Sequence, residues 1–165
     1  MKSLKLNIYP VLLVFLLAFG SCQTILAPAY DQAIVDGVTE NTELAMRFFA
    51  SVDGGTATED FTLRENTYNV LIGAFESLKI QAKARPVPKN VAMEKINKLL
   101  QAKGRNAISG NYPSAYAFEQ IAETFKKMKQ ADAEQNLRPL ALRAFKGQVE
   151  IFLDQAITYE SFLKR

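Results

Sequence analysis

The chain of 165 residues contains no histidine, no tryptophan and a single cysteine, Cys22. The lack of histidine excludes the Ser-His-Asp arrangement and the HExxH zinc motif, because both need an imidazole. One cysteine allows no intramolecular disulfide and no CxxC redox centre. The glycine-rich phosphate loops GxxxxGK[ST] and GxGxxG are also missing. The sequence therefore predicts no catalytic residue, no cofactor and no metal site, and favours a protein that is not an enzyme.

The N-terminus has the composition of a cleaved secretion signal. Lys2 and Lys5 give it a basic start, and an uninterrupted apolar run follows over 11–19. The apolar stretch 8–19 contains Pro10 and is shorter than the about 20 residues that a membrane-spanning helix requires. A basic start, a short apolar segment and small residues before a cut are typical of a removable signal peptide.

The end of this segment, Gly20-Ser21-Cys22, resembles the lipobox of bacterial lipoproteins, with Phe19 at the position where leucine is usual. In that family a diacylglyceryl group is attached to the cysteine thiol, the leader is cut just before it, and the new amine is usually acylated. The resemblance implies a signal peptide at 1–21 and lipidation of Cys22. The open alternative is an ordinary secretion signal that leaves Cys22 as a free thiol.

The resemblance also implies an address in the bacterial cell envelope, with acyl chains on Cys22 inserted into a membrane. Two or more acyl chains make such an anchor stable, whereas one chain holds a protein weakly. Gln23 follows the cysteine where an aspartate would favour the inner membrane, so the outer membrane is expected.

The charge of the mature chain is almost balanced. Loss of Lys2 and Lys5 with the leader leaves 18 basic residues against 17 acidic residues, a formal net charge of +1. A nucleic-acid-binding protein needs a clustered basic surface. We therefore expect no nucleic acid among the partners.

After a short tether at 22–29, the rest of the chain predicts one domain over 30–165. Apolar residues recur at helical spacing in five stretches. The expected helices cover about 31–52, 58–84, 89–103, 114–131 and a last helix from 132–136 to about 163. No stretch alternates like a strand. The fold class predicted is all-α, an antiparallel bundle of four to five amphipathic helices.

The spacing also predicts which side chains face the core and how two helices begin. The expected inward residues are Ile34, Val38, Ala45, Phe48, Val52, Phe61, Tyr68, Leu71, Phe75, Leu78, Ala82, Met93, Ile96, Leu100, Phe118, Ile121, Phe125, Met128, Leu142, Phe145, Val149, Phe152, Ala156, Tyr159 and Leu163. Thr58 is a plausible N-cap of the second helix. Pro139 fits the first turn of the last helix if Asn136 is its N-cap.

Several charged residues are candidates for a site. Glu119 with Glu123, and Glu150 with Asp154, are four residues apart and could hold a hard cation if they faced inward. The apolar residues of the same helices claim the inward faces, so solvated surfaces are expected. Arg64 lies on the apolar seam of the second helix. We expect its charge to extend to solvent at the end of the bundle, the alternative being a buried anchor for an acidic ligand or an inward carboxylate.

Tyr112 and Tyr116 are the candidate partner-binding residues. They lie with Phe118 around the start of the expected helix at 114–131, and exposed aromatic residues are common at protein interfaces. The alternative is a packing role. Lysines 126, 127 and 129 spread over more than one helical face, which favours a solvated surface over a lipid-binding patch.

Together these features predict a membrane-anchored envelope lipoprotein that acts as a non-enzymatic interaction or scaffold module. Its partners would be the membrane, through Cys22, and an unknown envelope protein. The alternative function is a helical bundle that binds a small apolar ligand or a lipid in its core or mouth.

Overall fold

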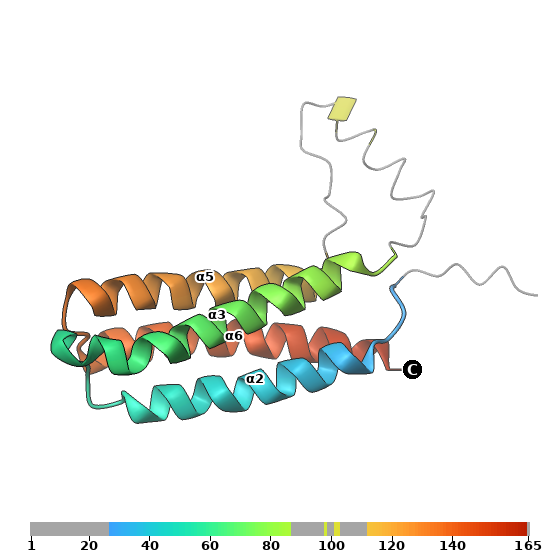
Figure 1. Ribbon diagram of the computed structural model, residues 1–165. Coiled ribbons are helices and arrows are strands. Elements are labelled where there is room, and N and C mark those ends of the chain that lie inside the picture. The colour runs from blue at the N-terminus through green and yellow to red at the C-terminus, as the bar shows by residue number, and fades with distance from the viewer. Residues whose placement is uncertain (1–26, 87–97, 99–100, 103–111, 165) are drawn as a thin grey trace, which may run out of the picture.

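Four long helices make up the described part of the protein in a computed structural model, which describes residues 27–86, 98, 101–102 and 112–164 (Figure 1). The helices are α2 (Gln32–Ser51), α3 (Phe61–Ala84), α5 (Pro113–Glu134) and α6 (Pro139–Leu163), with the 3-10 helix η1 (Thr58–Asp60) before α3. No strand occurs in these ranges. The predicted all-α bundle is confirmed. The helix expected at 89–103, with Met93, Ile96 and Leu100, lies outside the described residues except for 98 and 101–102.

The helices run antiparallel and close around one core. α3 packs against α2 and α5, and α6 packs against α5 and α2. The chain therefore enters and leaves the bundle at the same end, as Figure 1 shows. We call this the terminal end, formed by 27–31, 83–86, 112–113 and 162–164. The opposite end, formed by the connections 52–60 and 134–139, is called the loop end.

The apolar stripes expected from the sequence form this core in α2, α3 and α5. Their fully buried members include Ile34, Tyr68, Leu71, Phe75, Phe118, Ile121, Phe125 and Met128. Phe48 meets the ring of Tyr68 edge-on at 4.8 Å between centroids, and the ring of Phe125 stacks on Phe49 at 5.6 Å and on Phe75 at 6.2 Å. Each such aromatic pair adds about 0.5–1.5 kcal/mol beyond the burial of its surface. These rings join three of the four helices.

The buried face of α6 differs in part from the expected one. Leu142, Val149, Ala156 and Leu163 are buried as predicted, and Leu153 and Glu160 are buried as well. Phe145, Phe152 and Tyr159 are only partly buried. The steps from Val149 through 153, 156 and 160 to Leu163 alternate between four and three residues, so they hold one face toward the core. The expected face of α6 included Phe145, Phe152 and Tyr159 but not Leu153 and Glu160. It is therefore rotated about the helix axis relative to the buried face.

The predicted caps of α3 and α6 are wrong. Thr58 begins η1, and its backbone N–H and hydroxyl donate to Oδ1 of Asn136 at 2.8 and 2.7 Å. Asn136 therefore ties the two connections of the loop end together. α5 continues through Glu134, and α6 begins only at Pro139, in the first helical position where a proline loses no helical hydrogen bond.

The turn after α2 depends on Gly55. Its φ of +112° is a conformation that L side chains rarely adopt, and a Cβ there would lie 3.1 Å from the carbonyl oxygen of Leu137. The next residue, Thr56, donates its N–H to that carbonyl at 2.9 Å and accepts from the N–H of Leu137 at 3.0 Å. The turn thus brings the connection 52–60 against the connection 134–139.

Replacing Gly55 with alanine should lower the free energy of unfolding by about 1–3 kcal/mol, because the backbone strain cannot be relieved without breaking these bonds. Gly73 is the control, since it lies inside α3 with no atom within 4 Å of an added Cβ. Gly73→Ala should stabilise by up to about 1 kcal/mol. Urea unfolding followed by circular dichroism measures both. Equal effects of the two substitutions would contradict the role given to Gly55.

Candidate functional site

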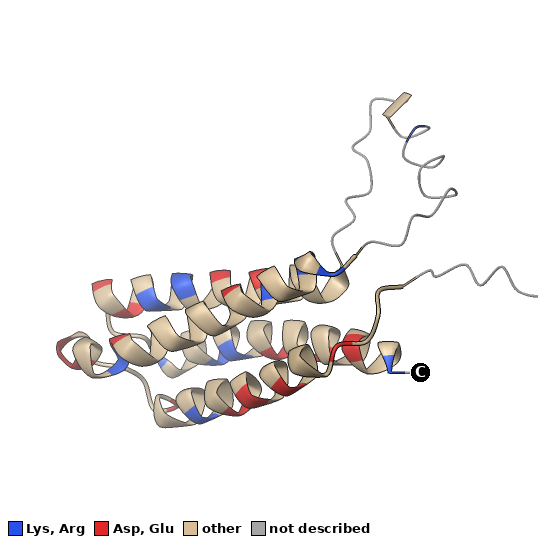
Figure 2. Cartoon of the chain, turned by 45° about the vertical axis from the view of Figure 1, so that its right-hand side comes forward, with Lys and Arg blue, Asp and Glu red and all other residues tan. Residues whose placement is uncertain are grey.

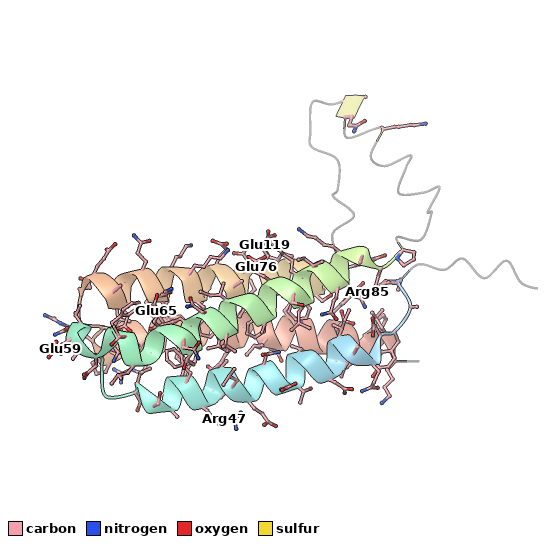
Figure 3. The ribbon with its side chains drawn as sticks, viewed as in Figure 1. Arg47, Glu59, Glu65, Glu76, Arg85 and Glu119 are labelled. Atoms are coloured by element: carbon pink, nitrogen blue, oxygen red, sulfur yellow. The ribbon has the colours of Figure 1, made fainter. Side chains whose placement is uncertain are left out.

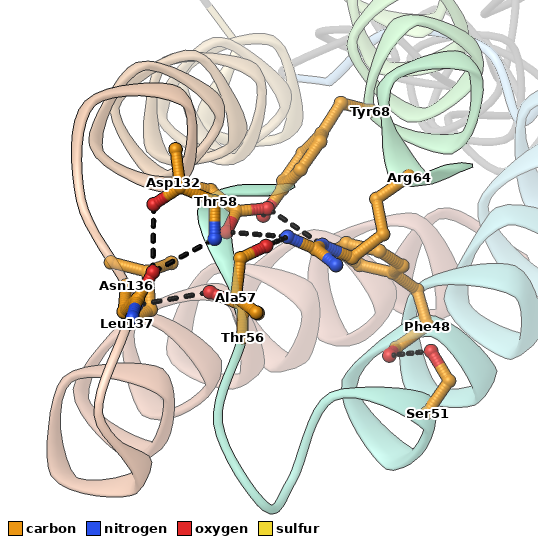
Figure 4. A network of polar contacts seen from close by, with 10 residues as sticks. All are labelled: Phe48, Ser51, Thr56, Ala57, Thr58, Arg64, Tyr68, Asp132, Asn136 and Leu137. Atoms are coloured by element: carbon orange, nitrogen blue, oxygen red, sulfur yellow. Dashed lines mark hydrogen bonds and ion pairs between the residues drawn. The ribbon is translucent and has the colours of Figure 1, made fainter. Parts of the chain in front are cut away.

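A buried ion pair lies at the loop end, between α3 and α5 (Figure 4). The guanidinium of Arg64 binds Asp132 through two hydrogen bonds, from Nε to Oδ2 at 2.8 Å and from Nη2 to Oδ1 at 2.9 Å. Nη2 also donates to the backbone oxygen of Ala57 at 2.8 Å. The Asp132 side chain is wholly buried, and 14% of the Arg64 side chain is exposed. The expectation that Arg64 extends to solvent is wrong, and the alternative of a buried carboxylate partner is confirmed.

Tyr68 completes this cluster. Its hydroxyl donates to Oδ2 of Asp132 at 3.2 Å. Burial raises the pKa of the Tyr68 phenol, and the neighbouring Asp132 carboxylate raises it further. The hydrogen bond to Asp132 raises the pKa of Arg64. The phenol is thus held neutral and the guanidinium charged, which suits a structural cluster and not a proton-transfer site.

A second buried ion pair lies at the terminal end, where Figure 3 labels Arg85. Its guanidinium donates to both oxygens of Glu160, from Nη1 at 2.8 Å and from Nη2 at 2.7 Å. Nη2 also donates to the hydroxyl of Ser114 at 3.1 Å. Arg85 follows α3, Ser114 lies in the first turn of α5 and Glu160 is near the end of α6, so one side chain joins three helices.

The sequence carries a signal for both pairs. The seam of α3 advances in alternating steps of three and four through Phe61, 64, 68, 71, 75, 78, 82 and 85, which includes both arginines. The seam of α5 reaches Asp132 by the same steps, and that of α6 reaches Glu160. A charged residue that is buried on an apolar seam needs a partner of opposite charge. Position on a seam therefore marks Arg64, Arg85, Asp132 and Glu160 as candidates for buried pairs, but it does not decide burial, since Lys146 lies on the α6 seam with 44% of its side chain exposed.

Of the two tyrosines predicted to bind a partner, Tyr112 is buried and Tyr116 is half exposed. The Tyr112 hydroxyl donates to the backbone oxygen of Pro86 at 2.7 Å, and its ring lies 5.2 Å from the guanidinium carbon of Arg85. Burial raises the pKa of Tyr112. This residue packs over the ion pair of the terminal end. Tyr116 meets Phe152 edge-on at 6.1 Å and leaves 49% of its surface exposed.

The remaining charged candidates form a solvated face between α3 and α5, as expected. Glu76 on α3 accepts from Lys126 on α5 at 2.8 Å and also pairs with Lys79. Hydrogen bonds from Lys126 and then Lys79 lower the pKa of Glu76. Glu119 lies 3.7 Å from Lys79, and Glu123 is bound to Lys126 at 2.8 Å. Figure 3 shows Glu76 and Glu119 on this outer face.

Lys129 and the second acidic pair complete the charged surface. Lys129 contacts Glu65 at 3.0 Å. Glu150 lies 3.7 Å from Lys146, and Asp154 is exposed. Within the described ranges no group of three or more Asp, Glu, Cys or His side chains is arranged to hold a metal ion.

Two shallow hollows lie on α6. The one at the loop end has a volume of about 660 Å³ and is lined by 135–138, Leu140, Ala141 and Ala144. The other, of about 560 Å³, lies toward the terminal end between Pro113, Ile151, Tyr159 and Phe162. Leu140, Ile151 and Phe162 are 73%, 66% and 58% exposed. Both hollows are open to solvent, which suits contact with a surface more than enclosure of a ligand.

Comparisons with protein-family models, with curated proteins and with solved structures find no match. Of the helices that the structure describes, none is both long and apolar enough to cross a membrane. Cys22 lies outside the described residues.

Arg85→Met should lower the free energy of unfolding by about 3–5 kcal/mol, because it leaves the buried Glu160 carboxylate without its charged partner. The double variant Arg85→Met/Glu160→Leu removes both charges and should recover most of that loss. Urea unfolding at pH 7 measures both variants. A double variant as unstable as the single one would show that the guanidinium acts through packing and not through its charge.

Glu76→Gln should lower the free energy of unfolding at pH 7 by up to about 1 kcal/mol. Because the folded state lowers the pKa of Glu76, its stabilising effect is present above the ordinary pKa of 4.5 and disappears as the pH falls through the lowered value. The difference in the free energy of unfolding between wild type and variant should therefore be smaller at pH 3 than at pH 7. Glu150→Gln, at a weaker surface pair, should have a smaller effect at pH 7. A Glu76→Gln difference as large at pH 3 as at pH 7 would contradict the assignment.

Proposed function

We propose that this protein is a bacterial envelope lipoprotein, held at a membrane by acyl chains on Cys22, whose helical bundle binds another envelope protein. The observation that carries this proposal is the N-terminal pattern, in which a basic start and a short apolar run lead to Gly20-Ser21-Cys22. We place the anchor in the outer membrane because Gln23, not aspartate, follows the cysteine. The bundle follows closely, with α2 starting at Gln32.

The interior of the bundle supports a role without catalysis. Every buried side-chain nitrogen and oxygen atom in the described part of the chain has a hydrogen-bond partner. The charges of Arg64, Asp132, Arg85 and Glu160 are used within their two pairs. A catalytic group must be able to reach a substrate with a reactive atom. These four side chains hold helices together instead.

The loop end supports contact with a protein. Leu140 is 73% exposed beside the hollow there, and Leu63 is 78% exposed near the start of α3. Asp53, Glu59, Asp60 and Glu134 are exposed around the same end, with Arg138 as the exposed basic residue. Opposite charges around an apolar contact steer and orient a partner. We propose a partner that presents an apolar side chain flanked by basic residues.

The alternative of an apolar ligand in the bundle core has less support. Phe75, Phe118 and Phe125 are fully buried at the centre of the bundle. Their rings lie 6.2 and 6.4 Å apart, with Phe75 between the other two. Aromatic rings of the described helices thus lie at the centre of the bundle, where such a ligand would bind.

Intact mass and cross-linking in cells test the two parts of this proposal. Wild-type protein should have the mass of a chain that begins at Cys22, increased by a diacylglyceryl group and an acyl chain, and should sediment with membranes. Cys22→Ser should lose both properties, because it has no thiol to acylate. An unmodified Cys22 thiol in native protein would contradict the anchor.

A photo-cross-linking residue at Leu140 should give a discrete product with one envelope protein, and high salt should reduce its yield. The matched control is Gln148, which is exposed on α6 away from the loop end. Equal products from positions 140 and 148, or none from either in an acylated protein, would contradict the partner-binding part.

A further inference from the structure

The described N-terminal chain is packed on the bundle from Pro28, six positions after Cys22 in the sequence. Pro28 is buried and Tyr30 is half buried. The amine of Lys164, directly after α6, lies 5.9 Å above the ring of Tyr30. Six peptide units separate Pro28 from Cys22, and even a fully extended chain of that length spans only about 20 Å. An acylated Cys22 would therefore keep the terminal end within about 20 Å of the lipid.

Exposed aromatic and apolar side chains surround this end. Phe162 in the last turn of α6 is 58% exposed, and Tyr116 in the first turn of α5 is 49% exposed. Ile80, one turn before the end of α3, is 64% exposed. Three of the four helices thus contribute one such residue, and the half-buried Tyr30 lies just before the fourth, α2. The exposed apolar residues near the loop end, Leu63 and Leu140, are aliphatic. Aromatic rings are favoured at the boundary between water and hydrocarbon because they combine an apolar body with a polar edge.

The charges at the two ends also favour the terminal end as the one that meets lipid. At the terminal end Lys83 and Lys164 are exposed, and Asp31 uses its carboxylate to accept the N–H of Ala33 at 2.9 Å. The loop end carries four exposed carboxylates, at 53, 59, 60 and 134, and one exposed guanidinium, Arg138. Figure 2 shows acidic residues where η1 and α5 meet the loop end and basic residues at the ends of α3 and α6, while α2 carries acidic residues up to its start at the terminal end. Anionic headgroups attract lysine and repel carboxylates.

We infer that the terminal end is a second, non-covalent membrane contact, in which Tyr116 and Phe162 enter the headgroup region and Lys83 and Lys164 meet anionic headgroups. This inference rests on the proposed acylation of Cys22. The contact holds the bundle on its end. Since α6 has 25 residues and each adds about 1.5 Å, the loop end stands about 37 Å further from the lipid. The hollow beside Leu140 then faces away from the membrane, toward other proteins.

The test uses full-length protein processed in the envelope and reconstituted into vesicles of phosphatidylethanolamine and phosphatidylglycerol. Acylation of Cys22 leaves no free thiol, so one introduced cysteine can be labelled with a fluorophore. Ser161→Cys reports on the terminal end and Ala133→Cys on the loop end, since both side chains are exposed. A quencher attached to the lipid headgroups should quench position 161 at least about threefold more than position 133, because quenching falls steeply with distance from the headgroups.

Tyr116→Ser with Phe162→Ser should reduce the quenching at 161 at least about twofold, because the apolar contribution to headgroup insertion is lost. The matched control, Leu63→Ser with Leu140→Ser, removes apolar surface from the loop end. It should leave the quenching at position 161 unchanged. Circular dichroism confirms that each variant keeps its helices.

Mass spectrometry of the same samples separates the two proposals. An unacylated Cys22 overturns the anchor, and the membrane contact that rests on it. An acylated protein with equal quenching at 161 and 133 overturns the membrane contact alone. If the label at position 161 is shielded in native envelopes but not in vesicles, the terminal end binds a protein partner instead of lipid. That result would also overturn the membrane contact.

Discussion

Each helix of this bundle carries an apolar stripe that can leave water only by facing the stripes of the others. The rings of Phe48, Tyr68, Phe75 and Phe125 meet at the centre and connect α2, α3 and α5. The rest of the structure depends on this packing, because it fixes the position of each helix along the bundle axis. That position decides which residues of neighbouring helices lie side by side. The charged residues at the ends of the seams can be buried only because the packing brings opposite charges to the same level.

The two buried pairs join different sets of helices. At the loop end Arg64 and Asp132 connect α3 to α5, and at the terminal end Arg85 connects α3 to α6 through Glu160 and to α5 through Ser114. A buried ion pair can be less stable than the apolar contact that would replace it. We therefore interpret the pairs as elements of specificity. A slip of α3 along its neighbours by one turn would leave four buried charges without partners, which disfavours alternative registers.

The two ends of the bundle differ in chemistry, and this difference is what gives the proposed function a direction. Aromatic residues and lysines gather at the end where the chain enters, whereas carboxylates surround the opposite end. An anchor at Cys22 would bring the first end to the lipid and present the second. The surface between α3 and α5 does not contribute to this difference between the ends, since Lys126 is paired there with Glu76 and Lys129 with Glu65.

The sequence by itself determined the helical class, the approximate span of each described helix and most of the core, because apolar spacing of three and four residues fixes which face leaves water. It also contains the Gly20-Ser21-Cys22 pattern that resembles a lipobox, on which the proposed address depends. Only the tertiary structure decided which residues the seam charges pair with, that Tyr112 is buried while Tyr116 is exposed, and that Asn136 binds Thr58 instead of capping α6. These contacts join residues 26 to 78 positions apart or depend on neighbouring helices. Local spacing fixes a face, but it does not fix which side chain of another helix lies opposite.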